Sequence, residues 1–272
     1  MRLRVDHETT YRFDPPMRGV VQSHRLTPSV FEGQQVIDWQ IDVGDAVRGA
    51  GFRDGAGDWV ETISVLGPVE NLTVRVTGEV ETVDLGGMLK GHRERIRPAA
   101  YLRPTPATKA DRTLQDLAHD TKAATGGNDP LALAHALSHA VGAAITYTPG
   151  QTEHDTTAAE ALALGHGVCA DHAHTLIAVA LCLDIPARYV TGYLFASEED
   201  GGHEASHAWA ELYLPDLGWV GFDISNGICP DARYIRIGSG ADAREASPIR
   251  GVTQGMGAEH LSARVSVNQV AQ

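Results

Sequence analysis

The spacing of the apolar residues changes near residue 100, and this change limits the possible folds more than any other feature of the sequence. In the first hundred residues, apolar positions alternate with polar ones, as they do along half-buried β-strands. The clearest runs are 3–13, 37–43 and 72–80. Beyond a proline-containing connector at 97–111, apolar residues recur every three or four positions, which is typical of amphipathic helices. The sequence therefore predicts an α+β protein with an N-terminal antiparallel β domain at 1–100 and a second domain at 101–272.

The net charge and the cysteine content argue against several classes of protein. The chain has 22 basic and 35 acidic residues and a net charge of -13, so we expect no nucleic-acid or membrane partner. Its three cysteines, Cys169, Cys182 and Cys229, do not suggest a disulfide framework and fit a reducing compartment. The N-terminus lacks the apolar segment of a signal peptide. The longest apolar stretch, 175–183, is far shorter than the roughly 20 residues of a membrane helix. We therefore expect a cytoplasmic protein.

Cys169 stands where a reactive thiol is expected. It follows Gly165 and Gly167 and begins an apolar, helical run at 169–184. The N-terminus of a helix offers unpaired N–H groups and roughly half a positive charge, which together stabilise a thiolate. The glycines would let the chain turn tightly into the helix, and we expect Asp171 to point away from the sulfur in a structural role. The alternative is that Cys169 is a small buried core residue, as free cysteines often are.

Two predicted strands after this helix carry a histidine and an aspartate. In 207–214 and 219–224 the even-numbered positions are apolar, so His207 and Asp223 share the face opposite to those residues. Both numbers are odd, so their pairing in a hairpin requires a loop with an odd number of residues, or a bulge. A four-residue turn at 215–218 has the wrong parity, and we therefore expect a wider loop or a bulge.

Cys169, His207 and Asp223 have the residue types of a nucleophilic acyl-transfer site. We expect Asp223 to accept a hydrogen bond from Nδ1–H of His207, which holds the imidazole in one tautomer while Nε2 faces the sulfur. The base would then lie within hydrogen-bond reach of the nucleophile, and the carboxylate would orient the base. The chain contains no nucleotide-binding glycine fingerprint, and we expect no cofactor.

Four sequence motifs around these residues resemble the transglutaminase-like superfamily, and specifically its bacterial branch with papain-like cysteine-protease chemistry. The motifs are GVCADHAH (167–174), IPARYVTGY (185–193), SHAWAE (206–211) and GWVGFDISNG (218–227). The resemblance is specific over about 145–230, and the N-terminal strands resemble the β region that precedes this core in many bacterial members. Many members have glutamine directly after the cysteine, where this chain has Ala170, and this difference leaves the details of substrate contact open.

The resemblance implies a papain-like core, in which the cysteine helix packs on an antiparallel sheet, and a role for each residue. Cys169 would be the nucleophile, His207 the base and Asp223 the orienting acid. The reaction implied is attack on a carboxamide of a peptide or protein substrate to give a thioester. If water resolves the thioester, the protein is a peptidase or amidase, and if an amine resolves it, the protein is a transglutaminase. No motif in the sequence decides between the two.

Three other interpretations use the same residues. A metal site could involve Cys169, His172, His174 and His203, but their spacing matches no zinc pattern well, and no oxygen-rich calcium loop is found. The arylamine acetyltransferases share the Cys-His-Asp order, although their cysteine lies in a different sequence context. A non-catalytic peptide-binding module could also be built on this fold.

Overall fold

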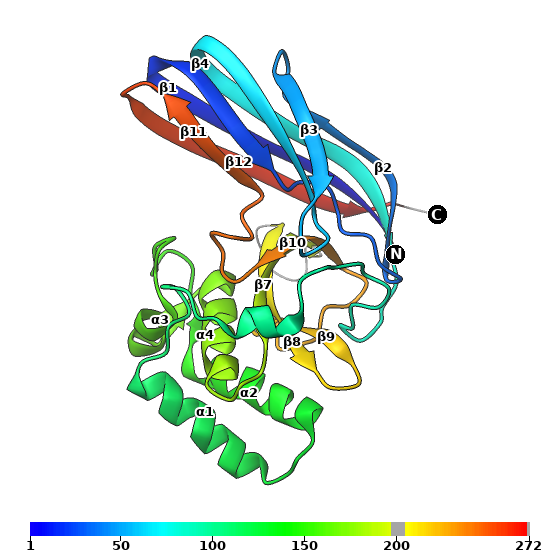
Figure 1. Cartoon of the computed structure of the whole chain (residues 1–272), viewed down its shortest axis with the longest axis vertical. Coiled ribbons are helices and arrows are strands. Elements are labelled where there is room, and N and C mark those ends of the chain that lie inside the picture. Colours follow the sequence, from blue (N-terminus) through cyan, green and yellow to red (C-terminus); the bar gives the residue numbers. More distant parts are fainter. Residues whose placement is uncertain (197–204, 271–272) are drawn as a thin grey trace.

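A computed structural model describes residues 1–196 and 205–270. Residues 2–82 form most of one bent antiparallel sheet around two long strands, β1 (Arg2–His24) and β4 (Trp59–Thr82), as Figure 1 shows. The strands β2 (Gln34–Asp42) and β3 (Val47–Arg53) both pair with β4. Side chains from both ends of β1 and β4 gather in a single buried cluster, which includes Tyr11, Val20, Ile63 and Val74. The two-residue alternation of the sequence thus supplies one buried face of this sheet.

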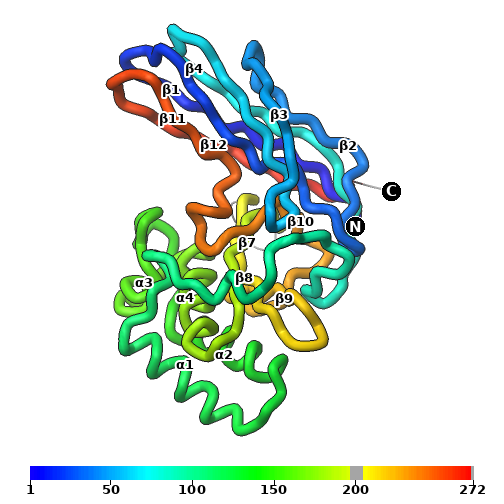
Figure 2. The backbone as a smooth tube through the Cα atoms, viewed as in Figure 1, coloured from blue at the N-terminus to red at the C-terminus, as the bar shows by residue number. Residues whose placement is uncertain are grey.

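The C-terminal strands complete the N-terminal sheet. Both β11 (Ile249–Gln254) and β12 (Ala258–Gln269) pair with β1, at its two ends. Figure 2 shows the backbone returning to the sheet after β10, in the orange and red part of the chain. The structure therefore differs from the division into 1–100 and 101–272, because β1 is long enough to pair with two strands that lie far away in the sequence.

The remaining residues form a layer of helices packed on a second antiparallel sheet. Its strands lie in the order β10-β7-β8-β9. Their bounds are Ala187–Leu194 for β7, Ser206–Leu214 for β8, Gly218–Phe222 for β9 and Tyr234–Gly240 for β10. The helices are α1 (Arg112–Thr125), α2 (Pro130–Ala144), α3 (Ala158–Leu164) and α4 (Cys169–Leu181), with a short 3-10 helix at Pro98–Leu102. A two-stranded parallel pair, β5 (Thr146–Tyr147) and β6 (His166–Gly167), lies just before α4.

The helix α4 packs on the even-numbered face of β8 and β9, as the sequence pattern predicts. Ala173, Leu176 and Ile177 of α4 belong to the same buried cluster as Ala210 and Phe222 of those strands. A capping box begins α3, because Thr157 and Glu160 bond each other's backbone N–H. The fold is α+β, with a cysteine helix packed on an antiparallel sheet.

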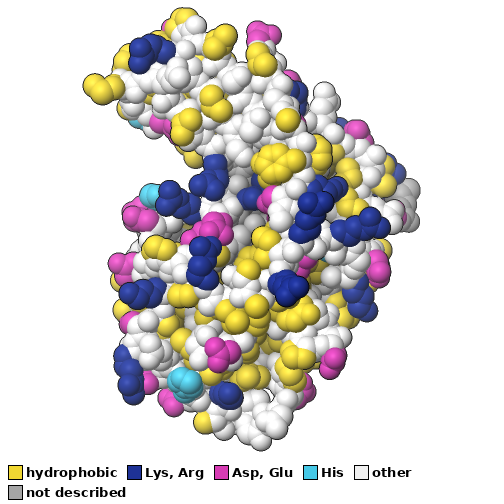
Figure 3. Space-filling model, in the orientation of Figure 1, with side chains coloured by type: hydrophobic (Ala, Val, Ile, Leu, Met, Phe, Trp, Pro, Cys, Tyr) yellow, Lys and Arg dark blue, Asp and Glu magenta, His cyan; other side chains and the backbone are white. Residues whose placement is uncertain are grey.

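Apolar and ionic contacts join the two sheets, which a hollow separates on one side of the molecule (Figure 3). Leu3 and Val5 of β1 share a buried cluster with Ile235 of β10. Beside it, Arg236 of β10 lies 3.0 Å from Asp58 and 2.9 Å from Glu211 of β8, and all three side chains are almost fully buried. Buried charges of this kind are stable only when paired, so each sheet depends on the other. Within the described residues, no helix is long and apolar enough to cross a membrane.

Candidate active site

Cys169 is the first residue of α4 and is partly exposed. Gly165 before it ends α3 in the left-handed conformation, with φ of 68°, which favours glycine. A Cβ on Gly167 would lie 2.7 Å from the side chain of Asp171, so only glycine leaves room for that carboxylate. Asp171 accepts hydrogen bonds from the N–H of Val168 (2.8 Å) and from Thr152 (2.7 Å). Asp171 therefore has the expected structural role, because these bonds hold the turn that presents the thiol.

The hairpin of β8 and β9 brings His207 and Asp223 to one face. Leu214 pairs with Gly218, so the loop contains only Pro215, Asp216 and Leu217. The odd number of loop residues required by the parity argument is confirmed, although the loop is shorter than expected and β8 and β9 contain no bulge. The pairing of Ala210 with Phe222, extended by one residue, places Asp223 across from Trp209 and diagonal to His207.

A short hydrogen bond joins His207 to Asp223, but through the ring nitrogen opposite to the predicted one. Nε2 of His207 lies 2.6 Å from Oδ2 of Asp223, and His207 also hydrogen-bonds to Cys169. The prediction that Nδ1 would face the carboxylate was wrong. Because Asp223 lies diagonally across the hairpin, the outer end of the ring reaches it, and Nδ1 is the ring nitrogen that is not used by the carboxylate.

Two residues without a predicted role hold the carboxylate of Asp223. The side-chain amide of Asn226 and the hydroxyl of Tyr234 each donate to Oδ2 over 2.6 Å. Asn226 lies in the GWVGFDISNG motif, which could have indicated it. Tyr234 comes from β10, which is not adjacent to β9 in the sheet, and no sequence pattern connects it to the site.

The charges at the site support an imidazolium next to a carboxylate. Burial alone would lower the pKa of His207, but the hydrogen bonds and negative charges of Asp223 and Cys169 raise it to about 10. Burial would raise the pKa of Asp223, but the bonds from His207, Asn226 and Tyr234 hold it below its ordinary value. At neutral pH the site therefore contains a protonated His207 and an ionised Asp223.

Trp209 shields one side of this pair, and Gly192 makes room for it. Its ring lies 6.4 Å from that of His207, with the two planes 29° apart. A Cβ on Gly192 of β7 would lie 2.7 Å from the indole, and one on Gly221 of β9 would lie 3.4 Å from it. Gly192 belongs to the IPARYVTGY motif and Gly221 to the GWVGFDISNG motif. The glycine of the first motif leaves the space that the tryptophan of the SHAWAE motif occupies.

The histidines considered as metal ligands make other contacts. Nε2 of His172 donates to the carbonyl of Ile145 (3.0 Å), and Nδ1 accepts from the hydroxyl of Ser225 (2.8 Å). Nε2 of His174 accepts from the N–H of Ala243 (3.0 Å). Burial lowers the pKa of both histidines. Among the described residues no group of three or more His, Cys, Asp or Glu is arranged to hold a metal, and His203 lies outside the described residues.

The other two cysteines lie apart from this arrangement. Cys182 follows the last residue of α4, at the end opposite to Cys169, and Cys229 lies beyond β9, close to Gly87. Burial raises the pKa of both thiols, with a further contribution from Asp84 at Cys229. Neither therefore has the activating environment that a nucleophile needs.

Comparisons with known proteins agree on the family. Residues 116–224 match the model of the transglutaminase-like superfamily, and residues 3–81 match the bacterial transglutaminase-like N-terminal region. An uncharacterized protein of Mycobacterium leprae is 30% identical over 284 residues, which cover 99% of each chain. An uncharacterized protein of Mycobacterium tuberculosis is 28% identical over 274 residues, 92% of this chain and 87% of the relative.

A solved structure shows the same fold. The structure of a proposed cysteine protease from Cytophaga hutchinsonii aligns with a TM-score of 0.75 and 21% identity, over 100% of this chain and 92% of that chain. At this identity the similarity is one of fold. Together with the family matches, it establishes that the chain belongs to the transglutaminase-like superfamily and carries the bacterial N-terminal region of that superfamily.

Proposed function

We propose that the protein is a thiol-dependent peptide or amide hydrolase, with Cys169 as nucleophile, His207 as acid and base, and Asp223 as orienting acid. The observation that supports this most is the position of His207, whose Nε2 lies 2.6 Å from Oδ2 of Asp223 and whose pKa is raised by Asp223 and by Cys169 together. A nucleophile, a base and an orienting group in one line are the requirements for nucleophilic acyl transfer.

The proposed reaction begins with the Cys169 thiolate, which attacks the carbonyl carbon of a peptide or carboxamide. The S–C bond forms, and the carbonyl oxygen becomes an oxyanion. The N–H of Cys169 lies in the first turn of α4, where it has no intrahelical acceptor, and is the first donor for that oxyanion. His207 then protonates the nitrogen as the C–N bond breaks, which releases the amine and leaves a thioester on the sulfur.

Hydrolysis of the thioester completes the cycle. Neutral His207 takes a proton from water as the water oxygen attacks the thioester carbon. The S–C bond then breaks, which releases a carboxylic acid and restores the thiolate and imidazolium pair. Asp223 stabilises the imidazolium in both halves of the cycle without becoming protonated itself.

A second candidate is transfer of the acyl group to an amine. The match of residues 116–224 to the transglutaminase-like core favours it, because the same thioester could be attacked by a primary amine in place of water. The two candidates differ only in what resolves the thioester.

One experiment tests the proposal and separates the two candidates. The protein is incubated with a peptide library, with and without a primary amine, and the products are identified by mass spectrometry. Cleaved or deamidated peptides would support the hydrolase, and amine conjugates would support the transferase. A Cys169→Ala variant is the control and should give no products while unfolding at the same temperature as the wild type. Product formation by that variant would refute the nucleophile assignment.

A reducing compartment, the cytoplasm, is part of the same proposal. All three cysteines are unpaired, and a free nucleophilic thiol keeps its function where glutathione and thioredoxin prevent oxidation. Fractionation of cells that express the native gene would test this part, and recovery of the protein outside the cytoplasmic fraction would overturn it.

A further inference from the structure

A single carboxylate oxygen in the site accepts three strong hydrogen bonds. Oδ2 of Asp223 lies 2.6 Å from Nε2 of His207, 2.6 Å from Nδ2 of Asn226 and 2.6 Å from the hydroxyl of Tyr234. From the described part of the chain, the other oxygen, Oδ1, accepts a longer bond of 3.3 Å from the N–H of Asn226. Donors on one oxygen compete for the same negative charge, because each bond reduces the charge available to the others.

Tyr234 is held firmly in position for this contact. It lies on β10 and is 5% exposed. Its ring meets the indole of Trp209 edge to face, at 5.5 Å and 85°. The hydroxyl is a donor, since burial and the neighbouring Asp223 both raise the pKa of Tyr234 far above its ordinary value.

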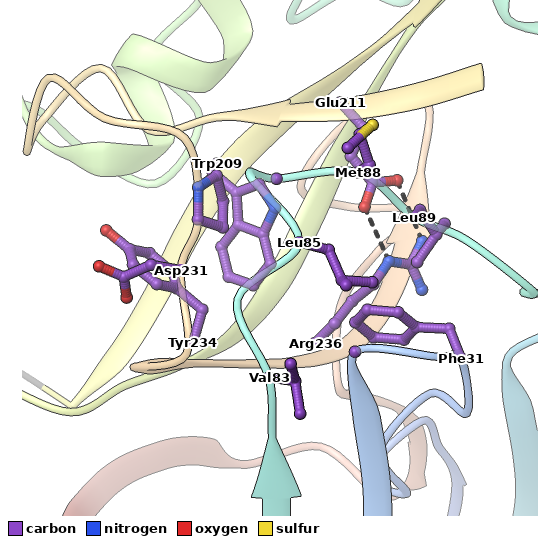
Figure 4. A pocket seen from close by; sticks show the side chains of 13 residues that line it. Phe31, Val83, Leu85, Met88, Leu89, Trp209, Glu211, Asp231, Tyr234 and Arg236 are labelled. Carbon is purple, nitrogen blue, oxygen red and sulfur yellow. Dashed lines mark hydrogen bonds and ion pairs between the residues drawn. The ribbon is translucent and has the colours of Figure 1, made fainter. Parts of the chain in front are cut away.

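Segments that flank the N-terminal strands restrict the space on the far side of Tyr234 and Trp209. Figure 4 shows these two side chains lining a cavity together with Phe31, from the connection between β1 and β2, and with Val83 and Leu85, from the chain that follows β4. The cavity measures about 40 Å³, which is room for no more than a few water molecules. A phenylalanine at position 234 would therefore keep the position of the tyrosine ring.

We propose that Tyr234 is a positioning residue of the site, whose hydroxyl shares Oδ2 of Asp223 with His207 and so limits how strongly the carboxylate holds the imidazolium. The inference rests on the proposed function for the roles of Cys169 and His207. It assigns a role in catalysis to β10, a strand that carries none of the three triad residues. A less strongly held imidazolium gives up its proton more readily to the departing amine.

The direction of the effect follows from the groups around the pair. Cys169 and His172 face His207 from α4, and Asp171 lies in the same helix turn. Arg233 and Asp231 influence Tyr234 from the segment before β10. A Tyr234→Phe change removes one neutral donor and leaves all of these charges in place. More of the negative charge of Asp223 then acts on His207, which should remain protonated to a higher pH.

The test measures the charge of His207 through the reactivity of Cys169 and needs no substrate. Iodoacetate is an anion and is attracted by the imidazolium, whereas iodoacetamide is neutral. The ratio of their rates of Cys169 alkylation, followed by peptide mapping, should fall as His207 loses its proton. In Tyr234→Phe the pH at which this ratio falls should be higher by about one unit. A hydrogen bond to a charged group is comparable in free energy to about one unit of pKa.

Two further variants make the result decisive. Asn226→Ala removes a second donor from Oδ2 and should shift the fall in the same direction. Tyr193→Phe is the matched control, because the hydroxyl of Tyr193 is equally buried but bonds His7 (2.8 Å), away from the triad, and it should cause no shift. An unchanged or lowered pH in Tyr234→Phe would overturn the inference. Equal, slow alkylation of all three cysteines in the wild type would instead overturn the proposed function.

Discussion

Gly192 of β7 lies directly opposite His207 of β8 in the antiparallel pairing of the two strands. A Cβ at this position would lie 2.7 Å from the ring of Trp209 and still closer to the carbonyl oxygen of Ile235. The backbone on one side and the indole on the other leave no space for even a methyl group. The glycine therefore allows the ring of Trp209 to lie against β7, next to the position opposite His207.

A Gly192→Ala variant should lose stability and thiol reactivity together. Because the added methyl group must displace Trp209 or β10, we expect a loss of about 1–3 kcal/mol in the free energy of unfolding. His207 should move with Trp209, so iodoacetamide should alkylate Cys169 more slowly. Urea unfolding and alkylation rates measure the two effects. Gly127→Ala is the control, since its nearest atoms are 3.9 Å away, and equal behaviour of the two variants would contradict this account.

An Asp223→Asn variant should remain folded but react very slowly. The amide of the introduced asparagine can turn its NH₂ group toward Nε2 of His207, which would then accept a hydrogen bond from it. In that tautomer Nδ1 carries the proton and cannot take one from the thiol. We expect peptide turnover to fall roughly 10³- to 10⁴-fold, which is comparable to the loss of turnover in a Ser-His-Asp triad whose histidine is held in the wrong tautomer. Asp216→Asn, in the loop of the same hairpin, should leave turnover unchanged. A rate near that of the wild type in Asp223→Asn would mean that another group orients His207.

The sequence pattern predicted the parts of the site that depend on local periodicity. Alternation along β8 and β9 placed His207 and Asp223 on one face, and the glycines before Cys169 predicted the turn into α4. The tautomer could not be predicted in this way, because it depends on whether Asp223 lies directly across from His207 or diagonally. That register is set by a three-residue loop, 215–217, where the sequence analysis expected a loop wider than four residues or a bulge.

Contacts between distant segments could not be predicted from the sequence either. Tyr234 reaches Asp223 from a strand with no motif of its own. Nothing in the sequences of β11 and β12 indicates that these strands pair with β1 rather than with the second sheet. Partner choice depends on the long-range packing of whole sheets, which a short-range apolar period does not encode.

An Asp58→Ala variant should destabilise the whole protein, since Asp58 links the N-terminal sheet to the core. Its carboxylate is fully buried and accepts from Arg236 (3.0 Å) and from the N–H of Ser239 (2.7 Å). Its removal leaves the charge of Arg236 buried with one partner fewer, which typically costs about 3–5 kcal/mol. Urea unfolding should show this loss in a single transition. Asp116→Ala, which breaks an exposed pair with Arg112, should cost less than about 1 kcal/mol, and a similar cost at both sites would refute a linking role.

Stability should fall as the pH drops from 6.5 toward 4, because four buried histidines resist protonation. Burial lowers the pKa of His7, His172 and His174, and it lowers the pKa of His24 to about 4, with a smaller contribution from Arg48. The unfolded chain binds protons near its ordinary pKa of about 6.5 while the folded chain does not, so protonation favours unfolding throughout this window.

The contribution of His24 can be isolated by mutation. With its pKa at about 4, His24 alone should account for a loss of about 2 kcal/mol between pH 7.5 and pH 5, measured by urea unfolding. His207 has the opposite shift, with a pKa of about 10 in the folded protein. Its stabilising contribution grows as the pH falls to about 6.5 and is constant below that, so it offsets part of the loss above pH 6.5 and none of it below. A His24→Gln variant should be less stable at pH 7.5 but less sensitive to acid, whereas His260→Gln, at an exposed position, should keep the sensitivity of the wild type. Equal acid sensitivity in the two variants would show that His24 titrates normally in the folded protein.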